Sequence, residues 1–140
     1  YQEATNVPMY MRWPAELGKR PRLDSRLVAN VDFAPTFYDV AGVAPGYKVD
    51  GKSLFDPEND RDYMLTEAVK WKALQDEDGS LIETRNEDGG KPFVEFYNWN
   101  VDPGEMDGEP RLTNSTQKKR FREMSAVLDR VKDCSGTDCP

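Results

Sequence analysis

The 140-residue chain contains no histidine and only two cysteines. Two thiols without a histidine make a poor zinc site, and the spacing of Cys134 and Cys139 differs from the Cys-x-x-Cys of redox motifs. No apolar run approaches the roughly 20 residues of a membrane span, and no charged start with an apolar stretch marks a targeting signal. The formal net charge of −7 disfavours nucleic acid as a partner, because phosphate binding needs a basic surface. We therefore expect no membrane span and no nucleic-acid partner.

The composition favours a folded protein of one or two compact units. The chain is 37% hydrophobic, 32% charged and 11% aromatic, which is too apolar for a disordered tail but leaner in core-forming residues than an average domain. No internal repeat or low-complexity tract is present, so a solenoid or a linker has no support.

Residues 7–13 (VPMYMRW) form a short apolar run that Pro14 ends. The run alternates poorly between apolar and polar positions, which predicts a strand that is covered on both faces. Such a strand needs a larger sheet, and the remaining residues offer none. We therefore expect that a part of the protein preceding Tyr1 is needed to complete it.

A short helix is predicted next, with Asp32 as its N-cap and Pro35 in its first turn, where a missing N–H costs little. The helix should end near Ala41, because Gly42 suits the left-handed residue that follows many helices.

Residues 56–62 (DPENDRD) are polar and are predicted to form a surface connection between residues 1–55 and a second unit, residues 63–140. Short β-favouring runs in the second unit predict a small antiparallel sheet. These runs are residues 63–67, 69–74 and 93–99, with a weaker one at 81–84. A final helix should begin near Ser115 or Thr116 and pack on this sheet through one apolar stripe. The stripe consists of Phe121, Met124, Leu128 and Val131.

Three segments occur in an order and spacing that identify a family. They are YQEATNVPMYMRWP at residues 1–14, NVDFAPTFYDVAGV at 30–43 and VDGKSLF at 49–55. Together they resemble the end of the catalytic domain of type I sulfatases, and FVEFYNWNVDPGEMDG at 93–108 resembles the element that closes the small C-terminal sheet of that family. The resemblance implies an α/β fold of the alkaline-phosphatase-like sulfatase type. This chain would supply its last main strand, the helix after it and the C-terminal subdomain.

The resemblance also implies the chemistry of the whole enzyme, which is hydrolysis of a sulfate ester to an alcohol and sulfate. In this family a formylglycine, made from the Cys or Ser of a C/S-x-P-x-R motif, attacks sulfur beside a bound calcium ion. Neither Cys134 nor Cys139 lies in that motif. The nucleophile, the histidines, the calcium ligands and the sulfate-binding lysine are therefore expected before Tyr1, in the same polypeptide or in a processed second chain. We assign no catalytic or metal residue and no cofactor to this chain.

Several residues remain candidates for other roles. The cysteine context and the secretory habit of the family favour a Cys134–Cys139 disulfide, and with it a secreted, periplasmic or lysosomal location. Asn114 begins an Asn-Ser-Thr glycosylation sequon. Trp71 and Trp99, like Tyr97, present aromatic surface that suits either a sugar ring or a small core, and we expect Trp99 to pack beneath the terminal helix.

Two basic segments allow more than one interpretation. Residues 117–132 carry a local charge of +4 and leave −11 on the remainder, which favours a helix laid on an acidic body over a contact with a sulfated polymer. Lys19 and Arg20 lie in a loop that is either solvated or part of a substrate rim. Two hypotheses for the chain as a whole remain. It is either a structural or specificity-setting part of a sulfatase that acts on a sulfated small molecule or glycan, or a free-standing carbohydrate-binding or interaction module.

Overall fold

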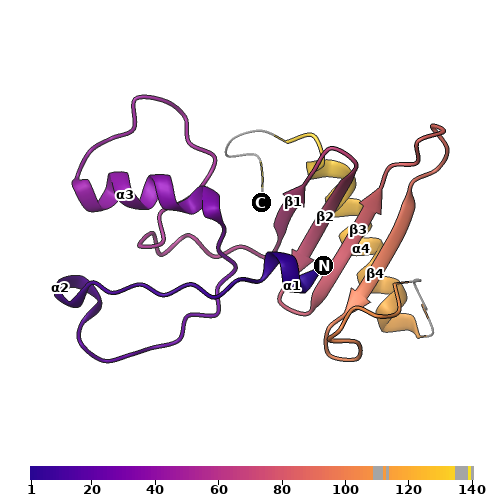
Figure 1. Cartoon of the computed structure of the whole chain (residues 1–140), viewed down its shortest axis with the longest axis horizontal. Coiled ribbons are helices and arrows are strands. Elements are labelled where there is room, and N and C mark those ends of the chain that lie inside the picture. Colours follow the sequence, from indigo (N-terminus) through magenta and orange to yellow (C-terminus); the bar gives the residue numbers. More distant parts are fainter. Residues whose placement is uncertain (109–111, 113, 135–138, 140) are drawn as a thin grey trace.

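The computed structural model describes residues 1–108, 112, 114–134 and 139. An arm made of residues 1–62 carries α2 and α3 at one end of the molecule, and a sheet crossed by α4 forms the other end (Figure 1). The helices are α1 (Gln2–Thr5), α2 (Pro14–Leu17), the 3-10 turn η1 (Asn30–Asp32), α3 (Phe33–Ala41) and α4 (Ser115–Val131). The strands are β1 (Met64–Glu67), β2 (Trp71–Asp76), β3 (Gly79–Thr84) and β4 (Phe93–Asn98).

The sheet is an antiparallel meander with the strand order β1-β2-β3-β4. Its register places Leu65 opposite Leu74, Leu74 opposite Leu81, and Leu81 opposite Phe96. Because side chains alternate between the faces of a strand, this row gives one face of the sheet a continuous apolar strip. The four predicted strands are confirmed, although β3 begins at Gly79, ahead of the predicted run.

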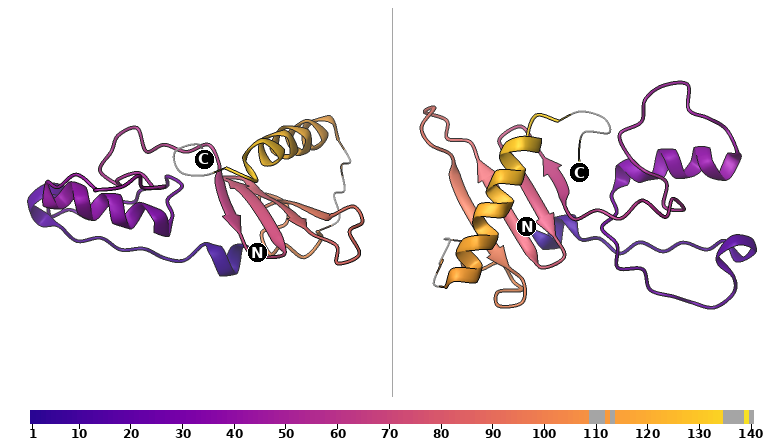
Figure 2. Two further views of the ribbon diagram at one scale, coloured as in Figure 1. Left: turned by 90° about the horizontal axis from the view of Figure 1, so that it is seen from above. Right: turned by 180° about the vertical axis from the view of Figure 1, so that it is seen from behind.

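Helix α4 crosses that apolar face of the sheet (Figure 2). Its N-cap residue is Asn114, whose Oδ1 accepts a hydrogen bond of 2.8 Å from the backbone N–H of Gln117. The predicted stripe is confirmed, with Phe121 half-buried and stacked edge-on against Phe96 at 5.6 Å between ring centroids. The buried cluster between helix and sheet consists of Leu74, Leu81, Phe96, Met124, Leu128 and Val131.

The prediction of a strand at residues 7–13 is wrong for this chain. The segment has no regular structure, and Tyr10 within it is 94% exposed. A strand is held by hydrogen bonds to a neighbouring strand, and none of the described residues pairs with this segment. The end of the segment is anchored by a packed ring, since Trp13 stacks edge-on against Phe55 at 5.3 Å between ring centroids.

The prediction of a short helix from Asp32 to Ala41 is confirmed by α3. Asp32 is its N-cap residue, and Gly42 follows it in the left-handed conformation with φ of 66°. The Asp32 side chain makes no capping hydrogen bond to the helix and turns instead toward Arg61. The predicted surface connection at residues 56–62 is wrong for Asn59, which is completely buried. The domain boundary placed there stays a prediction.

Candidate functional site

A buried ion pair between Asp32 and Arg61 holds the arm together. Their carboxylate and guanidinium are joined by two hydrogen bonds, from Arg61 Nη1 to Asp32 Oδ2 at 2.7 Å and from Nη2 to Oδ1 at 2.6 Å. The Asp32 side chain is 0% exposed and that of Arg61 is 5% exposed. The backbone N–H groups of Ala29 and Lys52 also donate to the Asp32 carboxylate, each at 2.9 Å. Four donors therefore satisfy this buried charge, as burial in a low-dielectric interior requires.

The ion pair has a clear electrostatic effect on Asp32. Burial by itself would raise the pKa of this carboxyl group, but the hydrogen bonds from Arg61, Ala29 and Lys52 outweigh burial and lower the pKa below its ordinary value. Asp32 is therefore ionised at neutral pH and cannot act as a general acid there.

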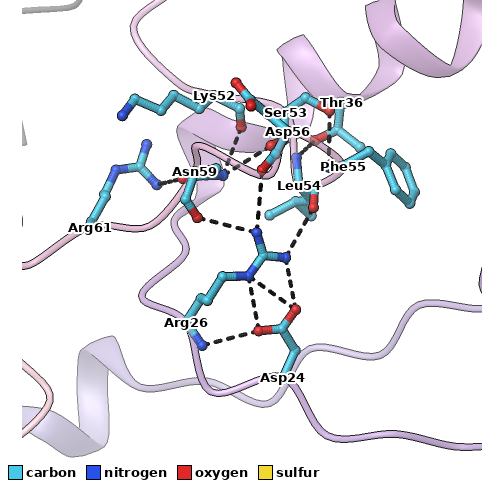
Figure 3. A network of polar contacts seen from close by, with 10 residues as sticks. All are labelled: Asp24, Arg26, Thr36, Lys52, Ser53, Leu54, Phe55, Asp56, Asn59 and Arg61. Carbon is cyan, nitrogen blue, oxygen red and sulfur yellow. Dashed lines mark hydrogen bonds and ion pairs between the residues drawn. The ribbon is translucent and has the colours of Figure 1, made fainter.

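The arm is tied further by Asn59 and Arg26 (Figure 3). Asn59 Oδ1 accepts from Arg61 Nη1 at 2.9 Å, and Asn59 Nδ2 donates to the carbonyl of Ser53 at 3.1 Å. The Arg26 guanidinium donates to backbone carbonyls of residues 54 and 59 at 3.1 and 3.2 Å. Hydrogen bonds from the side chain and the backbone N–H of Arg26 lower the pKa of Asp24 to about 2. We call Asp24, Arg26, Asp32, Asn59 and Arg61 the arm network.

A polar cleft of about 400 Å³ lies beside the arm network. Arg26 and Arg61 contribute to its lining, together with carboxylates from the arm and from the β2–β3 hairpin. These carboxylates are Asp60, Asp62, Asp76, Glu77 and Asp78. Among the described residues, no group of three or more His, Cys, Asp or Glu side chains is arranged to hold a metal ion. The cleft thus has carboxylates but neither a metal site within the described residues nor an imidazole.

A second polar centre, Glu105, lies on the face of the sheet opposite α4. Its buried carboxylate accepts hydrogen bonds from Ser80 Oγ at 2.8 Å and from Trp99 Nε1 at 2.7 Å through Oε1, and from the backbone N–H of Gln2 at 2.6 Å through Oε2. Glu105 has φ of 49°, which is unusual for a residue with a side chain. It therefore joins α1, the sheet and the loop after β4.

Tyr97 lies on the same face and is anchored by Glu95. Its hydroxyl donates to Glu95 Oε1 at 2.7 Å, and the hydroxyl of Tyr1 donates to the same oxygen at 3.1 Å. Burial and the hydrogen bond with Glu95 raise the pKa of Tyr97. Tyr97 is thus a neutral hydrogen-bond donor throughout the physiological pH range.

The structure brings together only some of the residues singled out from the sequence. Trp71 and Trp99 both pack, half-buried, against Ala73, Ile82 and Tyr97. The expectation that Trp99 lies beneath the terminal helix is wrong, because α4 covers the opposite face of the sheet.

Lys19 and Arg20 are exposed in the loop after α2, whereas Trp71 begins β2 and Trp99 follows β4. Because α2 lies at the end of the molecule away from the sheet (Figure 1), the structure does not bring the four predicted rim residues together. A shared substrate-rim role for them stays a prediction.

The remaining candidates lie at the two ends of α4. Cys134 and Cys139 form the predicted disulfide, with a Cα–Cα distance of 5.2 Å. Asn114 is exposed, and its side chain caps α4 through Oδ1. Its glycosylation stays a prediction.

Sequence reasoning missed the arm network and Glu105. Asp32 was recognised only as an N-cap residue, because its partners Arg61 and Lys52 are 29 and 20 residues away. Asn59 lies in a charged run that resembles an exposed linker. One signal was present for Glu105, since the segment 93–108 that resembles the sulfatase element includes it.

The described residues hold few of the groups that commonly carry hydrolytic chemistry. The chain has no histidine, and both of its cysteines are bonded to each other. The ionised groups of the arm network are held by one another, so none of them is an activated nucleophile. No helix in the described part of the chain is long and apolar enough to span a membrane.

Comparison with known proteins identifies the class to which this scaffold belongs. Residues 1–72 match the family described as N-sulphoglucosamine sulphohydrolase, C-terminal. The matched residues include the whole arm network, and the chain belongs to this family of sulfatase C-terminal regions. The resemblance to sulfatases seen in the sequence is thereby confirmed.

Two individual relatives support this assignment. The chain is 41% identical over 54 residues to an N-acetylglucosamine-6-O-sulfatase of Bacteroides thetaiotaomicron, a match that covers 39% of this chain and 10% of that protein. The second relative is a protein whose structure was solved in complex with its substrate, D-glucosamine-2-N,6-O-disulfate. Its chain matches this one with a TM-score of 0.58 and 27% sequence identity, and the match covers 74% of this chain and 23% of that chain. The chain thus spans about a tenth and about a quarter of these two relatives.

Proposed function

We propose that this chain is the C-terminal part of a sulfatase that hydrolyses sulfate esters of glucosamine-containing sugars. The observation that carries the proposal is the family match over residues 1–72, a segment that contains the complete arm network. The substrate class is supported by the two relatives, one named for N-acetylglucosamine 6-sulfate and one bound to a glucosamine disulfate. Because the chain matches the C-terminal region of the family, we propose a structural role for it within the enzyme.

Exposed apolar surface on the arm supports the need for a larger partner. An apolar groove of about 420 Å³ lies along α3, and Phe37 in its lining is 69% exposed. Val7, Tyr10 and Met11 are also exposed on the arm. A contiguous apolar surface such as the groove along α3 is typical of a protein–protein contact. We propose that the N-terminal part of the sulfatase, in the same polypeptide or as a processed second chain, covers this surface.

The cofactors belong to the same proposal. Formylglycine and calcium would supply the attacking oxygen and the positive charge beside the sulfate. The residues described here do not fit either group, since the two cysteines form a disulfide and no set of described carboxylates converges as a metal site. We therefore place both groups in the N-terminal part and derive no step of the reaction for this chain.

A non-cytosolic location is part of the proposal as well. The Cys134–Cys139 disulfide supports it, because disulfides persist in secreted, periplasmic and lysosomal proteins and are rare in the reducing cytosol. Thiol labelling of the protein in its native source tests this point. Free thiols at both positions would contradict it.

The proposed function is tested by reconstituting the enzyme from two parts. The 140-residue chain is combined with the N-terminal part of its parent protein, and sulfate release is measured from N-acetylglucosamine 6-sulfate and from glucosamine-2-N,6-O-disulfate. We expect no release by either part alone and release by the complex. The substitution Phe37→Ser should weaken assembly, whereas Val101→Ser, at a position equally exposed on the sheet subdomain, should not.

Two results would overturn the proposal. One is a stable monomeric chain that binds these sugars tightly and never joins the N-terminal part, which would indicate a free-standing carbohydrate-binding module. The other is a reconstituted complex that carries formylglycine and calcium and releases no sulfate from either compound or from an aryl sulfate.

A further inference from the structure

A row of basic residues runs along the outer face of α4. Lys118, Arg122, Ala126 and Arg130 follow one another at intervals of four residues, and all four are exposed. Residues four apart on a helix are surface neighbours, with Cβ atoms roughly 5–6 Å apart. These residues therefore form one continuous ridge, which we call the 118–130 ridge. At 1.5 Å of rise per residue it is about 18 Å long.

The cations of the 118–130 ridge form no ion pair with any residue that the structure describes. Each carboxylate beside the ridge is held by a lysine that lies outside it. These pairs are Lys119–Glu123 at 3.5 Å, Lys132–Asp129 at 2.7 Å and Lys72–Asp133 at 3.3 Å. Within the part of the chain that the structure describes, no ion pair engages Lys118, Arg122 or Arg130. Three positive charges thus remain available along the ridge.

The ridge faces away from the sheet. Met124 and Leu128 on the other side of α4 are buried against the strands, and Arg120 pairs with Asp76 of β2. Figure 2 shows α4 lying across one face of the sheet, with no other described element over its outer side. The small side chain of Ala126 adds no bulk between Arg122 and Arg130. A ligand can therefore lie along the ridge from end to end.

We propose that the 118–130 ridge binds a sulfated glycan chain. Three free cations in one line suit a linear ligand with repeated anionic groups, whereas a single small anion would meet only one or two of them. Arginine is well suited to tetrahedral oxyanions, because its guanidinium presents parallel N–H donors. The choice of a sulfated sugar rests on the proposed function, since a solved relative binds a glucosamine disulfate.

The net charge of the whole chain limits the range over which the ridge can attract a sulfated glycan. The whole chain carries −7, so its long-range field does not attract a polyanion. The attraction is local to the ridge and is screened by salt over roughly 8–10 Å at physiological ionic strength. We therefore expect binding that weakens as the salt concentration rises.

The experiment measures binding of a size-defined sulfated octasaccharide prepared from heparin to the 140-residue chain by titration calorimetry at low salt. The test variant is Lys118→Gln, Arg122→Gln, Arg130→Gln. Its matched control is Lys48→Gln, Arg85→Gln, Lys91→Gln, which removes the same charge from exposed loop positions. All six positions are exposed, so both variants should keep the circular dichroism spectrum of the parent chain. The chemically desulfated octasaccharide and a single-stranded DNA of similar charge are the ligand controls.

We expect the ridge variant to bind the sulfated octasaccharide about tenfold more weakly, as the loss of three partly exposed ionic contacts predicts. The loop variant should stay within about twofold of the parent, and the desulfated sugar should not bind. Equal losses in the two variants, equal affinity for DNA, or no measurable binding of the sulfated octasaccharide would each overturn the proposal. Because this readout is binding to the chain itself, it separates failure of the ridge from failure of the proposed hydrolysis.

Discussion

Replacing Arg61 by methionine should loosen the arm without unfolding the sheet. The substitution removes two of the four donors to the completely buried Asp32 carboxylate and leaves only the backbone N–H groups of Ala29 and Lys52. Removing one partner of a buried ion pair typically costs about 3–5 kcal/mol, because the remaining charge is left unpaired. Since two donors to Asp32 remain, we expect a value near the lower end, about 3 kcal/mol.

Residue-resolved amide hydrogen exchange is the suitable assay, because the Ala29 and Lys52 amides themselves donate to Asp32. A loss of about 3 kcal/mol predicts exchange roughly 150-fold faster at these amides, at 1.36 kcal/mol per factor of ten. The double variant Asp32→Asn, Arg61→Met removes the unpaired charge and should regain roughly half of the loss. Arg20→Met, at an exposed position, is the matched control. Exchange in Arg61→Met within threefold of the parent, or an equal change in the control, would refute the reasoning.

Three further predictions concern pH, Glu105 and the core beneath α4. Because the pKa of Asp32 is lower in the fold than its ordinary value of 3.8, its stabilisation is complete above that pH and is lost as the pH falls through the folded pKa. Protection of the Lys52 amide should therefore decline only below about pH 4, and a decline near neutrality would contradict this. Glu105→Ala leaves Trp99 Nε1 without its acceptor and should cost about 2 kcal/mol in urea denaturation followed by tryptophan fluorescence; a loss under about 0.5 kcal/mol would count against it. Leu128→Ala opens a cavity in the core and should cost about 3 kcal/mol in urea denaturation followed by circular dichroism, and a neutral effect would be inconsistent with the packing described.

The parts of the fold that the sequence predicted are those whose partners lie within the chain and close by. The apolar stripe of α4 and the four strands of the meander pack against one another, so their periodicity is interpreted correctly. The prediction of a strand at residues 7–13 is wrong because the partners of such a strand are missing from the described residues. A strand covered on both faces needs neighbouring strands to bond, and the described residues supply none.

Two of the errors had different causes. The prediction for Trp99 named the wrong face of the sheet, although the alternation of side chains along a strand indicates the correct one. Residues 96 and 99 are an odd number of positions apart, so their side chains are expected on opposite faces. The arm network could not be predicted in the same way. Its long-range contacts join residues 20 to 33 positions apart, and no periodic pattern marks a single buried Asp, Asn or Arg as a partner at that separation.

The hydrogen bond from Gln2 to Glu105 has a consequence for the order in which the chain folds. It joins residues that are 103 positions apart, whereas the meander pairs strands that follow one another directly. Closing a longer loop costs more conformational entropy, and contacts between distant residues slow folding. We expect the meander and α4 to form first and α1 to dock last. Docking of α1 is then the step that completes the buried face around Glu105.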